Sequence, residues 1–328
     1  MTDGSAPNEP KTRHFKKSAE RVNSKAVIDI GSNSIKLRVA CKEENKLRTV
    51  LDTTEVVRLG QGLGKGVIDE KTMKHGVEVI RRLTRLAGEK GARPRLVGTM
   101  ALRTAANAGE FVRMVREQTG ILVDILSGEE EARLAWLGAT TALGLTGCDT
   151  AVFDTGGGST EFIFGHGTRI TRSFSMPLGA VRLTEDFLVS DPVCPESLCS
   201  AKEHIRDVLT YAPGLGNKCP PFVIGLGGGV AAMASVKLAL PAFSPEAVNG
   251  TFLTKDDIDV QVALYASSTA AARMEITGLP PKRADIILAS ACIVQCILEV
   301  MGIDTFRVSI NGLRHGLLLE MFKGKALT

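Results

Sequence analysis

The stretch AVFDTGGGSTEFIFG, residues 151–165, decides the fold of this chain. Residues 151–154 form a short apolar run that ends in a carboxylate, three glycines follow, and residues 161–165 resume an apolar, aromatic-rich pattern. This pattern predicts two strands joined by a glycine-rich hairpin, whereas the P-loop and the dinucleotide fingerprint both open a helix. Glycines in such a turn can direct backbone N–H groups toward an anion, and the hydroxyls of Ser159 and Thr160 are further donors. The hairpin is therefore a candidate phosphate site, with a hairpin that merely turns as the alternative.

A second copy of this pattern lies near the start of the chain. Residues 26–40 read AVIDIGSNSIKLRVA and superpose on the first stretch without a gap. Asp29 aligns with Asp154, and Gly31 aligns with Gly156. Two Asp-x-Gly hairpins in the same register predict an internal duplication in which each copy opens its own lobe.

Length and charge limit the classes of protein. The chain has 328 residues, more than one core usually organises, so two domains are expected. A formal net charge of +4 creates no global field for nucleic acid, so we expect no nucleic-acid partner. Residues 1–22 are polar and basic, which predicts a disordered tail rather than a secretory signal.

Cysteine usage favours a reduced, cytoplasmic compartment. There are 7 cysteines, an odd number, and they form no Cys-x-x-Cys motif. Residues 284–301, which contain Cys292 and Cys296, carry acidic and amide side chains and therefore read as a buried core helix, not a membrane span. We expect the two thiols to be packing residues, with a soft-metal site as the weaker alternative.

The remaining pattern divides the chain into a first lobe at residues 23–126 and a second at 127–311, with a final helix at 312–326 packing back on the first. Helices are expected at 71–90 and from 101 to about 118. A further helix begins with SGEEEARL at 127–134, where Ser127 and Glu130 fit a capping box. Glu131 lies at the join between the lobes, which is the wall of the cleft in a two-lobed enzyme. A purely structural acidic helix start is the alternative reading.

A second glycine-rich loop occurs in the second lobe. Residues 222–224 read as a strand that runs into GLGGGVAAMASV at 225–236, and this loop opens a helix. A helix N-terminus behind a glycine loop is an anion site by its dipole and its free N–H groups, although the signal alone is weak.

Six motifs taken together resemble the exopolyphosphatase and guanosine pentaphosphate phosphohydrolase (Ppx/GppA) family. They are DIGSNS at 29–34, GTMALRTA at 98–105, SGEEEARL at 127–134, DTGGGSTE at 154–161, GLGGGVAAMA at 225–234 and SINGLRHG at 309–316. The resemblance implies an α/β fold of two ribonuclease-H-like lobes with mixed sheets and an interlobe cleft, as in the actin, hexokinase and Hsp70 superfamily. It also implies hydrolysis of a terminal phosphoanhydride with Mg²⁺ or Mn²⁺, with stimulation by a monovalent cation as a further possibility.

The resemblance assigns roles to individual residues. Glu131 matches the general base that activates water, and Arg103 matches the phosphate-binding arginine of the catalytic centre. The metal ligands it implies are Asp154, Glu161 and Asp29. The phosphate-binding residues it implies are Ser32, Asn33, Ser34, Gly156, Gly157, Gly158, Ser159, Gly227 and Gly228.

Two departures from the family pattern bear on substrate binding. Gly229 stands where the family usually has a threonine, so one hydroxyl contact to phosphate is missing or replaced by backbone. Longer relatives append further C-terminal domains, whereas this chain ends soon after its last helix, so a long polyphosphate must be held by the lobes or by a homodimer groove. The basic side chains of Arg273, Lys282, Arg283 and Arg314 are candidates for a polyanion channel, with scattered surface charge as the alternative.

Three functions remain open at this point. Inorganic polyphosphate is the leading substrate, and guanosine pentaphosphate (pppGpp) is a close variant that the motifs do not separate. An actin-like kinase of a small metabolite is the second class. Glu131 argues against it, because Glu131 is expected to activate water and a kinase excludes water. A non-enzymatic sensor of penta- or tetraphosphate nucleotides is the third class. The presence of all three carboxylates, Glu131, Asp154 and Glu161, argues against a protein that has lost catalysis. No membrane partner is expected.

Overall fold

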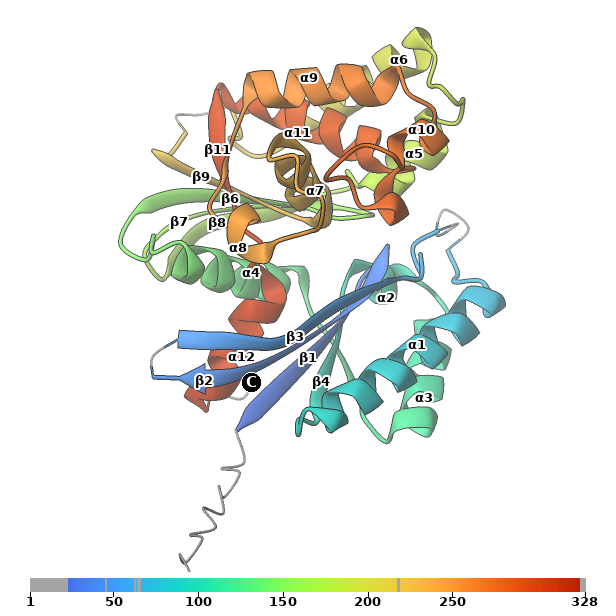
Figure 1. The fold of residues 1–328 in the computed structure, drawn as a ribbon, viewed down its shortest axis with the longest axis vertical. Coiled ribbons are helices and arrows are strands. Elements are labelled where there is room, and N and C mark those ends of the chain that lie inside the picture. The colour runs from blue at the N-terminus through green and yellow to red at the C-terminus, as the bar shows by residue number, and fades with distance from the viewer. Residues whose placement is uncertain (1–22, 45, 62, 64–65, 217–218, 325–328) are drawn as a thin grey trace, which may run out of the picture.

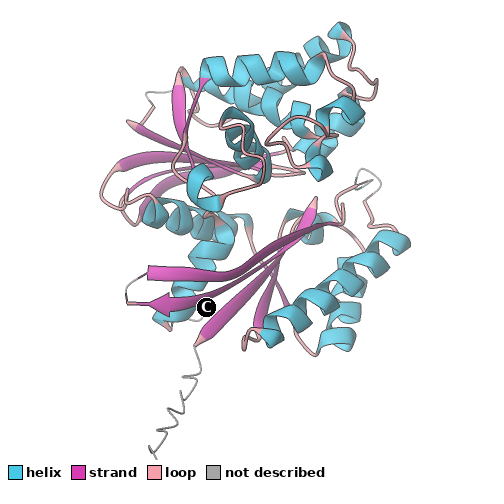
Figure 2. Ribbon diagram, viewed as in Figure 1, coloured by secondary structure: helices cyan, strands magenta, loops and turns pink. Residues whose placement is uncertain are grey.

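The computed structural model describes residues 23–44, 46–61, 63, 66–216 and 219–324 of the chain. Two lobes lie one above the other (Figure 1), and each is built on a sheet with helices packed against it (Figure 2). The basic tail predicted at residues 1–22 lies outside the described residues.

The N-terminal lobe is a five-stranded mixed sheet in the order β3-β2-β1-β4-β5. Strands β1, β2 and β3 form an antiparallel meander, while β4 lies parallel to β1 and β5 parallel to β4. The strands are β1 (Ser24–Ile30), β2 (Ser34–Glu43), β3 (Lys46–Val56), β4 (Pro94–Gly98) and β5 (Val123–Ile125), and the helices are α1 (Glu70–Glu89), α2 (Met100–Thr104) and α3 (Ala108–Thr119).

The C-terminal lobe is a six-stranded mixed sheet in the order β10-β11-β9-β6-β7-β8. Its strands are β6 (Asp149–Thr155), β7 (Thr160–His166), β8 (Arg169–Met176), β9 (Phe222–Leu226), β10 (Phe252–Thr254) and β11 (Thr305–Val308). Its helices are α5 (Ala180–Phe187), α6 (Pro195–Thr210), α7 (Gly228–Lys237), α8 (Pro245–Val248), α9 (Lys255–Ala266), α10 (Ala270–Arg273), the 3₁₀ turn η2 (Pro281–Arg283) and α11 (Ile287–Met301).

The two sheets repeat one topology. Read from β8, the C-terminal order β8-β7-β6-β9-β11 reproduces β3-β2-β1-β4-β5, and β10 is an addition at the edge. The parallel pairings agree as well, because β9 lies beside β6 as β4 lies beside β1. The internal duplication predicted from the two hairpins is confirmed, and so is the fold class of two ribonuclease-H-like lobes with mixed sheets.

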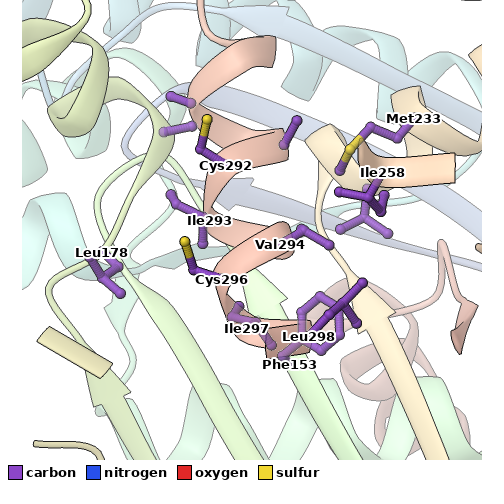
Figure 3. Close-up of a cluster of buried hydrophobic side chains, with 14 of the residues drawn as sticks. Phe153, Leu178, Met233, Ile258, Cys292, Ile293, Val294, Cys296, Ile297 and Leu298 are labelled. Carbon is purple, nitrogen blue, oxygen red and sulfur yellow. The ribbon is translucent and has the colours of Figure 1, made fainter. Parts of the chain in front are cut away.

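Strand alternation divides each lobe's core into two layers. In β1, Ala26, Ile28 and Ile30 pack with the buried faces of α1 and α3, whereas Val27 packs on the opposite side of the sheet. In the C-terminal lobe, α11 is buried on every side and packs against Phe153 of β6 (Figure 3). Its apolar residues therefore anchor the helix rigidly beside the sheet.

The two cysteines of α11 are packing residues. Cys292 and Cys296 lie in the core around α11 (Figure 3), and burial raises the pKa of these thiols to about 12 and about 11. All seven cysteines of the chain are free. No group of three or more His, Cys, Asp or Glu side chains in the described part of the chain is arranged to hold a metal.

Two helices lie between the sheets. Helix α4 (Gly128–Ala142) packs Ala132, Ala135 and Trp136 on the back of the C-terminal sheet, while α12 (Leu313–Lys323) packs Leu317 and Leu318 on the back of the N-terminal sheet. The helices cross through glycines: a Cβ on Gly138 would lie 2.3 Å from the Gly312 carbonyl oxygen, and one on Gly316 would lie 2.0 Å from that of Leu134. Helix α4 thus starts at the predicted lobe boundary and touches both lobes.

Three segments differ from what their sequence predicts. Residues 42–59 predict short β-like pieces, but this segment holds the end of β2 and the long strand β3. The helix expected from 101 to about 118 is broken into α2 and α3. The segment from 191 to about 211 predicts a helix, and α6 begins only at Pro195, which takes the first helical position. Strand β8 and helix α5 were not predicted.

Candidate active site

The two glycine hairpins meet across the gap between the lobes. A Cβ on Gly157 would lie 3.0 Å from the Cβ of Asn33, and one on Gly158 would lie 3.3 Å from the Oγ of Ser32. A Cβ on Gly158 would also lie 1.9 Å from the Cε of Met100. Close approach of the lobes, and not only the turn, therefore requires glycine at these positions.

The C-terminal hairpin is held so that its amides are free. The Gly156 amide donates to the Ser159 carbonyl at 2.8 Å, while the carbonyls of Gly156 and Gly157 accept from Ala180 and Val181 of α5 at 3.1 and 2.9 Å. The N–H and C=O groups of a trans peptide point in opposite directions, so the amides of Gly157 and Gly158 point away from α5. They have no backbone partner within the described part of the chain, and both are available to an anion.

The N-terminal hairpin repeats this arrangement with different supports. The Gly31 amide donates to the Ser34 carbonyl at 3.1 Å. The Ser32 carbonyl accepts from Gly60 at 2.7 Å, and the Asn33 carbonyl accepts from Arg58 at 2.9 Å. By the same geometry the Asn33 amide points away from the supporting segment.

A cavity of about 100 Å³ lies between the hairpins. Every site residue predicted from the sequence lines it except Arg103. The predicted residues in its wall are Asp29, Ser32, Asn33, Ser34, Glu131, Asp154, Gly156, Gly157, Gly158, Ser159, Glu161, Gly227 and Gly228.

Arg103 reaches the cavity only through Glu131. Its Nη1 donates to Glu131 Oε2 at 2.7 Å and to the Leu126 carbonyl at 2.9 Å. The predicted arginine and the predicted base are therefore partners of each other. Arg103 orients the Glu131 carboxylate toward the cavity wall.

Glu131 occupies the first turn of α4. Ser127 caps this helix, with its Oγ accepting from the Glu130 amide at 3.1 Å, but Glu130 pairs with Arg133 and does not complete the capping box. Burial and the charge of Glu161 raise the pKa of Glu131 to about 8 in spite of Arg103. A carboxyl that titrates near neutral pH is suited to proton transfer.

Two further carboxylates stand opposite each other on β6 and β7, where Asp154 pairs with Glu161 across the strands. Burial and the Glu161 charge raise the pKa of Asp154 to about 7, and burial also raises the pKa of Glu161. The Oε1 of Glu161 accepts from Ser159 at 2.6 Å and from Ser175 at 2.9 Å. The Ser159 hydroxyl, predicted to bind phosphate, is thus directed at Glu161 instead.

The donor set suits a hard cation. Carboxylates that raise one another's pKa are stabilised by a positive charge between them, and oxygen ligands are those that Mg²⁺ prefers. Three such side chains do not converge in a metal-binding group within the described residues. The arrangement therefore resembles sites in which one or two carboxylates and substrate phosphate share the ion with water.

The third loop completes the cavity from the other side. Gly227 has φ +116°, and a Cβ there would lie 2.3 Å from the Thr155 carbonyl oxygen, so only glycine fits. No side chain caps α7, which leaves its first amides open to the cavity. A Cβ on Gly228 would lie 1.9 Å from a guanidinium nitrogen of Arg283.

Comparison with known proteins identifies the family of the chain. The sequence model of the Ppx/GppA phosphatase family matches residues 38–325. The chain belongs to this family. Exopolyphosphatase 2 of Mycobacterium tuberculosis is 29% identical over 320 residues, which cover 90% of this chain and 98% of that protein. A Ppx/GppA crystal structure from Aquifex aeolicus is 30% identical with a TM-score of 0.78, covering 93% of this chain and 99% of that one.

Two other proteins are similar to this chain. A bifunctional 3-dehydroquinate synthase/phosphatase of Fusobacterium nucleatum is 27% identical over 314 residues, and the aligned part is 92% of this chain but only 47% of that protein. An exopolyphosphatase structure from Cytophaga hutchinsonii shares the fold, with a TM-score of 0.84 at 24% identity, and covers 92% of this chain and 99% of that one. Membership in the Ppx/GppA family makes the chain a hydrolase of phosphoanhydride bonds.

Several residues of this Ppx/GppA site escaped sequence reasoning. Thr155, Ser290 and Lys36 line the cavity, and Ser175 supports Glu161. Arg283, already a candidate for the polyanion channel, lines the cavity as well, and its guanidinium makes no hydrogen bond or ion pair with any described residue. Thr155 lies within the motif at 154–161, but the motif assigned its hydroxyl no role. Lys36, Ser175 and Ser290 lie outside all six motifs and far apart in the sequence.

The candidate channel arginines have different roles. Arg273 is buried, and its guanidinium donates to the carbonyls of Tyr265 and Ala284, so it holds structure and does not face a channel. Arg314 pairs with Asp52. Lys282, Arg283 and Arg314 nevertheless border a second cavity.

That second cavity, of about 600 Å³, adjoins the first and shares Asp29, Lys36 and Asp154 with it. Its wall is largely apolar. The apolar residues are Val56, Leu226, Ala231, Ala232, Phe243, Pro245, Pro280, Pro281, Ile310 and Leu313. Separately, no helix of residues 23–44, 46–61, 63, 66–216 and 219–324 is both long and apolar enough to cross a membrane.

Proposed function

We propose that this chain is a Mg²⁺-dependent exopolyphosphatase, which releases orthophosphate from the end of inorganic polyphosphate. The observation that carries the proposal is the cavity where free amides of two glycine hairpins meet Glu131 and the Asp154–Glu161 pair. Amide donors bind phosphate oxygens, and a carboxylate at the wall activates water. Phosphoryl transfer needs mainly such positioning and charge stabilisation.

The reaction follows from these groups. Glu131, held by Arg103, takes a proton from a water molecule while the water oxygen bonds to the terminal phosphorus. The bond from this phosphorus to the bridging oxygen breaks, and the shortened chain leaves with the electron pair as a phosphate oxyanion. Glu131 then returns its proton to solvent.

Asp154 and Glu161 are the residues that would hold Mg²⁺, and Asp29, the third expected ligand, lines the same cavity. Bound there, the ion neutralises charge on the phosphate oxygens and favours the ionised carboxylates. The amides of Gly157, Gly158 and Asn33 orient the terminal phosphate.

The test is release of phosphate by wild type and Glu131→Gln. Short polyphosphate, long polyphosphate, guanosine pentaphosphate and ATP are each assayed with and without Mg²⁺. We expect the variant to lose about 10²–10⁴-fold in kcat while it still binds tripolyphosphate, because only the proton acceptor is removed. Glutamine keeps the size and one acceptor oxygen for Arg103.

A matched control is Glu130→Gln, in the same helical turn but paired with Arg133, which we expect to keep kcat within about threefold of wild type. Wild-type release by Glu131→Gln would remove Glu131 from the mechanism. No release by wild type from any of the four substrates would refute the proposed activity.

The apolar second cavity favours guanosine pentaphosphate as a second candidate substrate. A polyphosphate chain is anionic along its whole length and gains nothing from the apolar wall around Phe243, whereas a purine base and ribose would bury there. The basic side chains of Lys282 and Arg283 at its edge suit the phosphates. In the same assay, a kcat/KM at least about tenfold higher for guanosine pentaphosphate than for tripolyphosphate would select this candidate.

A further inference from the structure

The space for a side chain at position 229 is filled by another helix. An ideal Cβ on Gly229 would lie 2.5 Å from the Oγ and 2.6 Å from the Cβ of Ser290. Such distances are far below van der Waals contact, so residues 229 and 290 compete for one place in the structure. The chain puts a glycine in the loop and a serine in α11, and the hydroxymethyl group enters from α11.

Ser290 is fixed firmly in this position. It lies near the start of α11, the helix whose apolar residues are buried on every side (Figure 3), and only 3% of its surface is exposed. Ser290 and Gly229 line the same cavity as the two glycine hairpins. The serine thus presents its hydroxyl beside the uncapped N-terminus of α7.

The Ser290 hydroxyl has only a weak partner. Its Oγ donates to the Ile286 carbonyl at 3.2 Å, and that carbonyl already accepts the Ser290 amide at 3.1 Å. A hydroxyl hydrogen rotates freely, and a phosphate oxygen is a stronger, charged acceptor. An anion in the cavity would therefore redirect this donor at little cost.

An independent observation points to a ligand at the same place. The Oγ1 of Thr155 is buried, with 4% of the residue exposed, and it has no hydrogen-bond partner among the described residues. Thr155 lines the cavity together with Gly227, and its carbonyl oxygen fills the space that a Cβ on Gly227 would need. A buried hydroxyl without a partner is unfavourable, and a phosphate oxygen would satisfy it.

We propose that Ser290 supplies the hydroxyl that binds a substrate phosphate at the third glycine loop, in the place that a side chain at position 229 would occupy. The inference rests on the proposed function, since it concerns the same cavity. It assigns a phosphate-binding role to a residue of α11, outside all the loop motifs.

The first test removes the hydroxyl. Ser290→Ala keeps the Cβ, and we expect about a tenfold rise in KM for tripolyphosphate with kcat within about threefold, because a charged hydrogen bond is lost. The matched control is Ser235→Ala on α7, a serine that is buried like Ser290, has no hydrogen-bond partner for its Oγ among the described residues and lies outside the cavity wall. Ser235→Ala should leave KM unchanged.

The second test exchanges the two residues. Gly229→Ser combined with Ser290→Gly returns a hydroxyl to the same space from the loop side, and we expect KM within about threefold of wild type. Gly229→Ser alone should raise KM more than Ser290→Ala or the double exchange does, because the new Cβ clashes with Ser290. A merely structural role for Ser290 would not be rescued by a hydroxyl on the opposite backbone.

Binding of tripolyphosphate, measured by calorimetry, separates this inference from the proposed function. Weaker binding by Ser290→Ala with recovery in the exchange variant supports the inference even if no substrate is hydrolysed. Equal binding and equal KM for wild type, Ser290→Ala and Ser235→Ala would overturn it. If Ser290→Ala does not fold, Ser290→Cys keeps the volume with a weak donor, and wild-type KM in that variant would overturn the inference as well.

Discussion

The two glycine hairpins share one backbone design and differ in the side chains they carry. Both close with a glycine amide donating to a serine carbonyl, from Gly31 to Ser34 and from Gly156 to Ser159. In both, an aspartate faces a charged residue across the strands, but Asp29 pairs with Lys36 and Asp154 pairs with Glu161. Both hairpins therefore present the same backbone amides. The residue opposite the aspartate, Lys36 or Glu161, decides whether a positive or a negative charge lies beside those amides.

This difference suits the two hairpins to different ligands. The N-terminal hairpin brings a cation 3.9 Å from Asp29, which suits it to phosphate, and the C-terminal hairpin brings a second carboxylate, which suits it to a metal. The tips differ as well, because Ser32 and Asn33 carry side chains where Gly157 and Gly158 have none. Side chains of one hairpin pack into the space that the glycines of the other leave.

The largest effect on this difference between the hairpins is expected from Glu161→Gln. It removes the carboxylate that distinguishes the second hairpin while keeping its size, so the expected loss is about 100-fold in kcat with a large rise in the Mg²⁺ required, because metal charge stabilisation is lost. Titration of activity with Mg²⁺ measures both. The control Ser175→Ala removes one donor to Glu161 but keeps the charge, and it should lose less than about fivefold. An unchanged Mg²⁺ titration in Glu161→Gln would count against metal binding there.

Glycine packing between the hairpins is tested by Gly157→Ala. The new methyl group would lie 3.0 Å from Asn33 Cβ and 3.2 Å from Val181 Cγ2, so the loop must shift. We expect about a 30-fold loss of kcat/KM and a stability loss of about 1–2 kcal/mol from overpacking, read from kinetics and thermal unfolding. Gly109→Ala in α3, where a Cβ meets nothing within 4 Å, should leave both unchanged or raise stability. Full activity of Gly157→Ala would show that the lobes separate easily.

The sequence was informative where residues of one short segment act together. The hairpins, their common register and the glycine loop before α7 follow from local patterns, because strand alternation and turn chemistry are set within about ten residues. Asp29, Glu131 and Asp154 lie in such segments, and the structure places all three in the wall of the cavity. Helix α11 was recognised as core for the same reason, because its residues are apolar all round.

Contacts between distant segments were not predictable. The pairing of Arg103 with Glu131, the donation from Ser159 to Glu161, and the meeting of Gly229 with Ser290 each depend on how separate elements are packed. The motifs named Arg103, Glu131, Ser159 and Glu161. They predicted that Ser159 binds phosphate, whereas in the structure its hydroxyl donates to the Glu161 carboxylate. Ser290 lies in a helix whose sequence signals only burial, so its hydroxyl gave no functional signal.

The like-charged pair on the second hairpin predicts a pH-dependent Mg²⁺ requirement. The pKa of Asp154 is raised to about 7 by burial and by Glu161, so below pH 7 a proton competes with the ion. We expect the half-saturating Mg²⁺ concentration to rise by up to about tenfold per pH unit as pH falls from 7 to 6, and to change little between pH 8 and 9. In Glu161→Gln the dependence should flatten, because the pKa of Asp154 falls when the neighbouring charge is removed. The same half-saturation at pH 6 and pH 8 in wild type would contradict this linkage.

The smallest expected effect belongs to the charge that distinguishes the first hairpin. Lys36 lines both cavities and is partly exposed, so Lys36→Gln removes one screened point charge from the phosphate path and should raise KM about fivefold with kcat nearly unchanged. Its KM should also depend less on salt than that of wild type, because one charge pair with substrate is gone. Lys42→Gln, on the same strand but exposed outside both cavities, is the matched control. If Lys36→Gln instead lowered kcat with KM unchanged, the lysine would act on the transition state, and the two hairpins would share the catalytic charge rather than divide it.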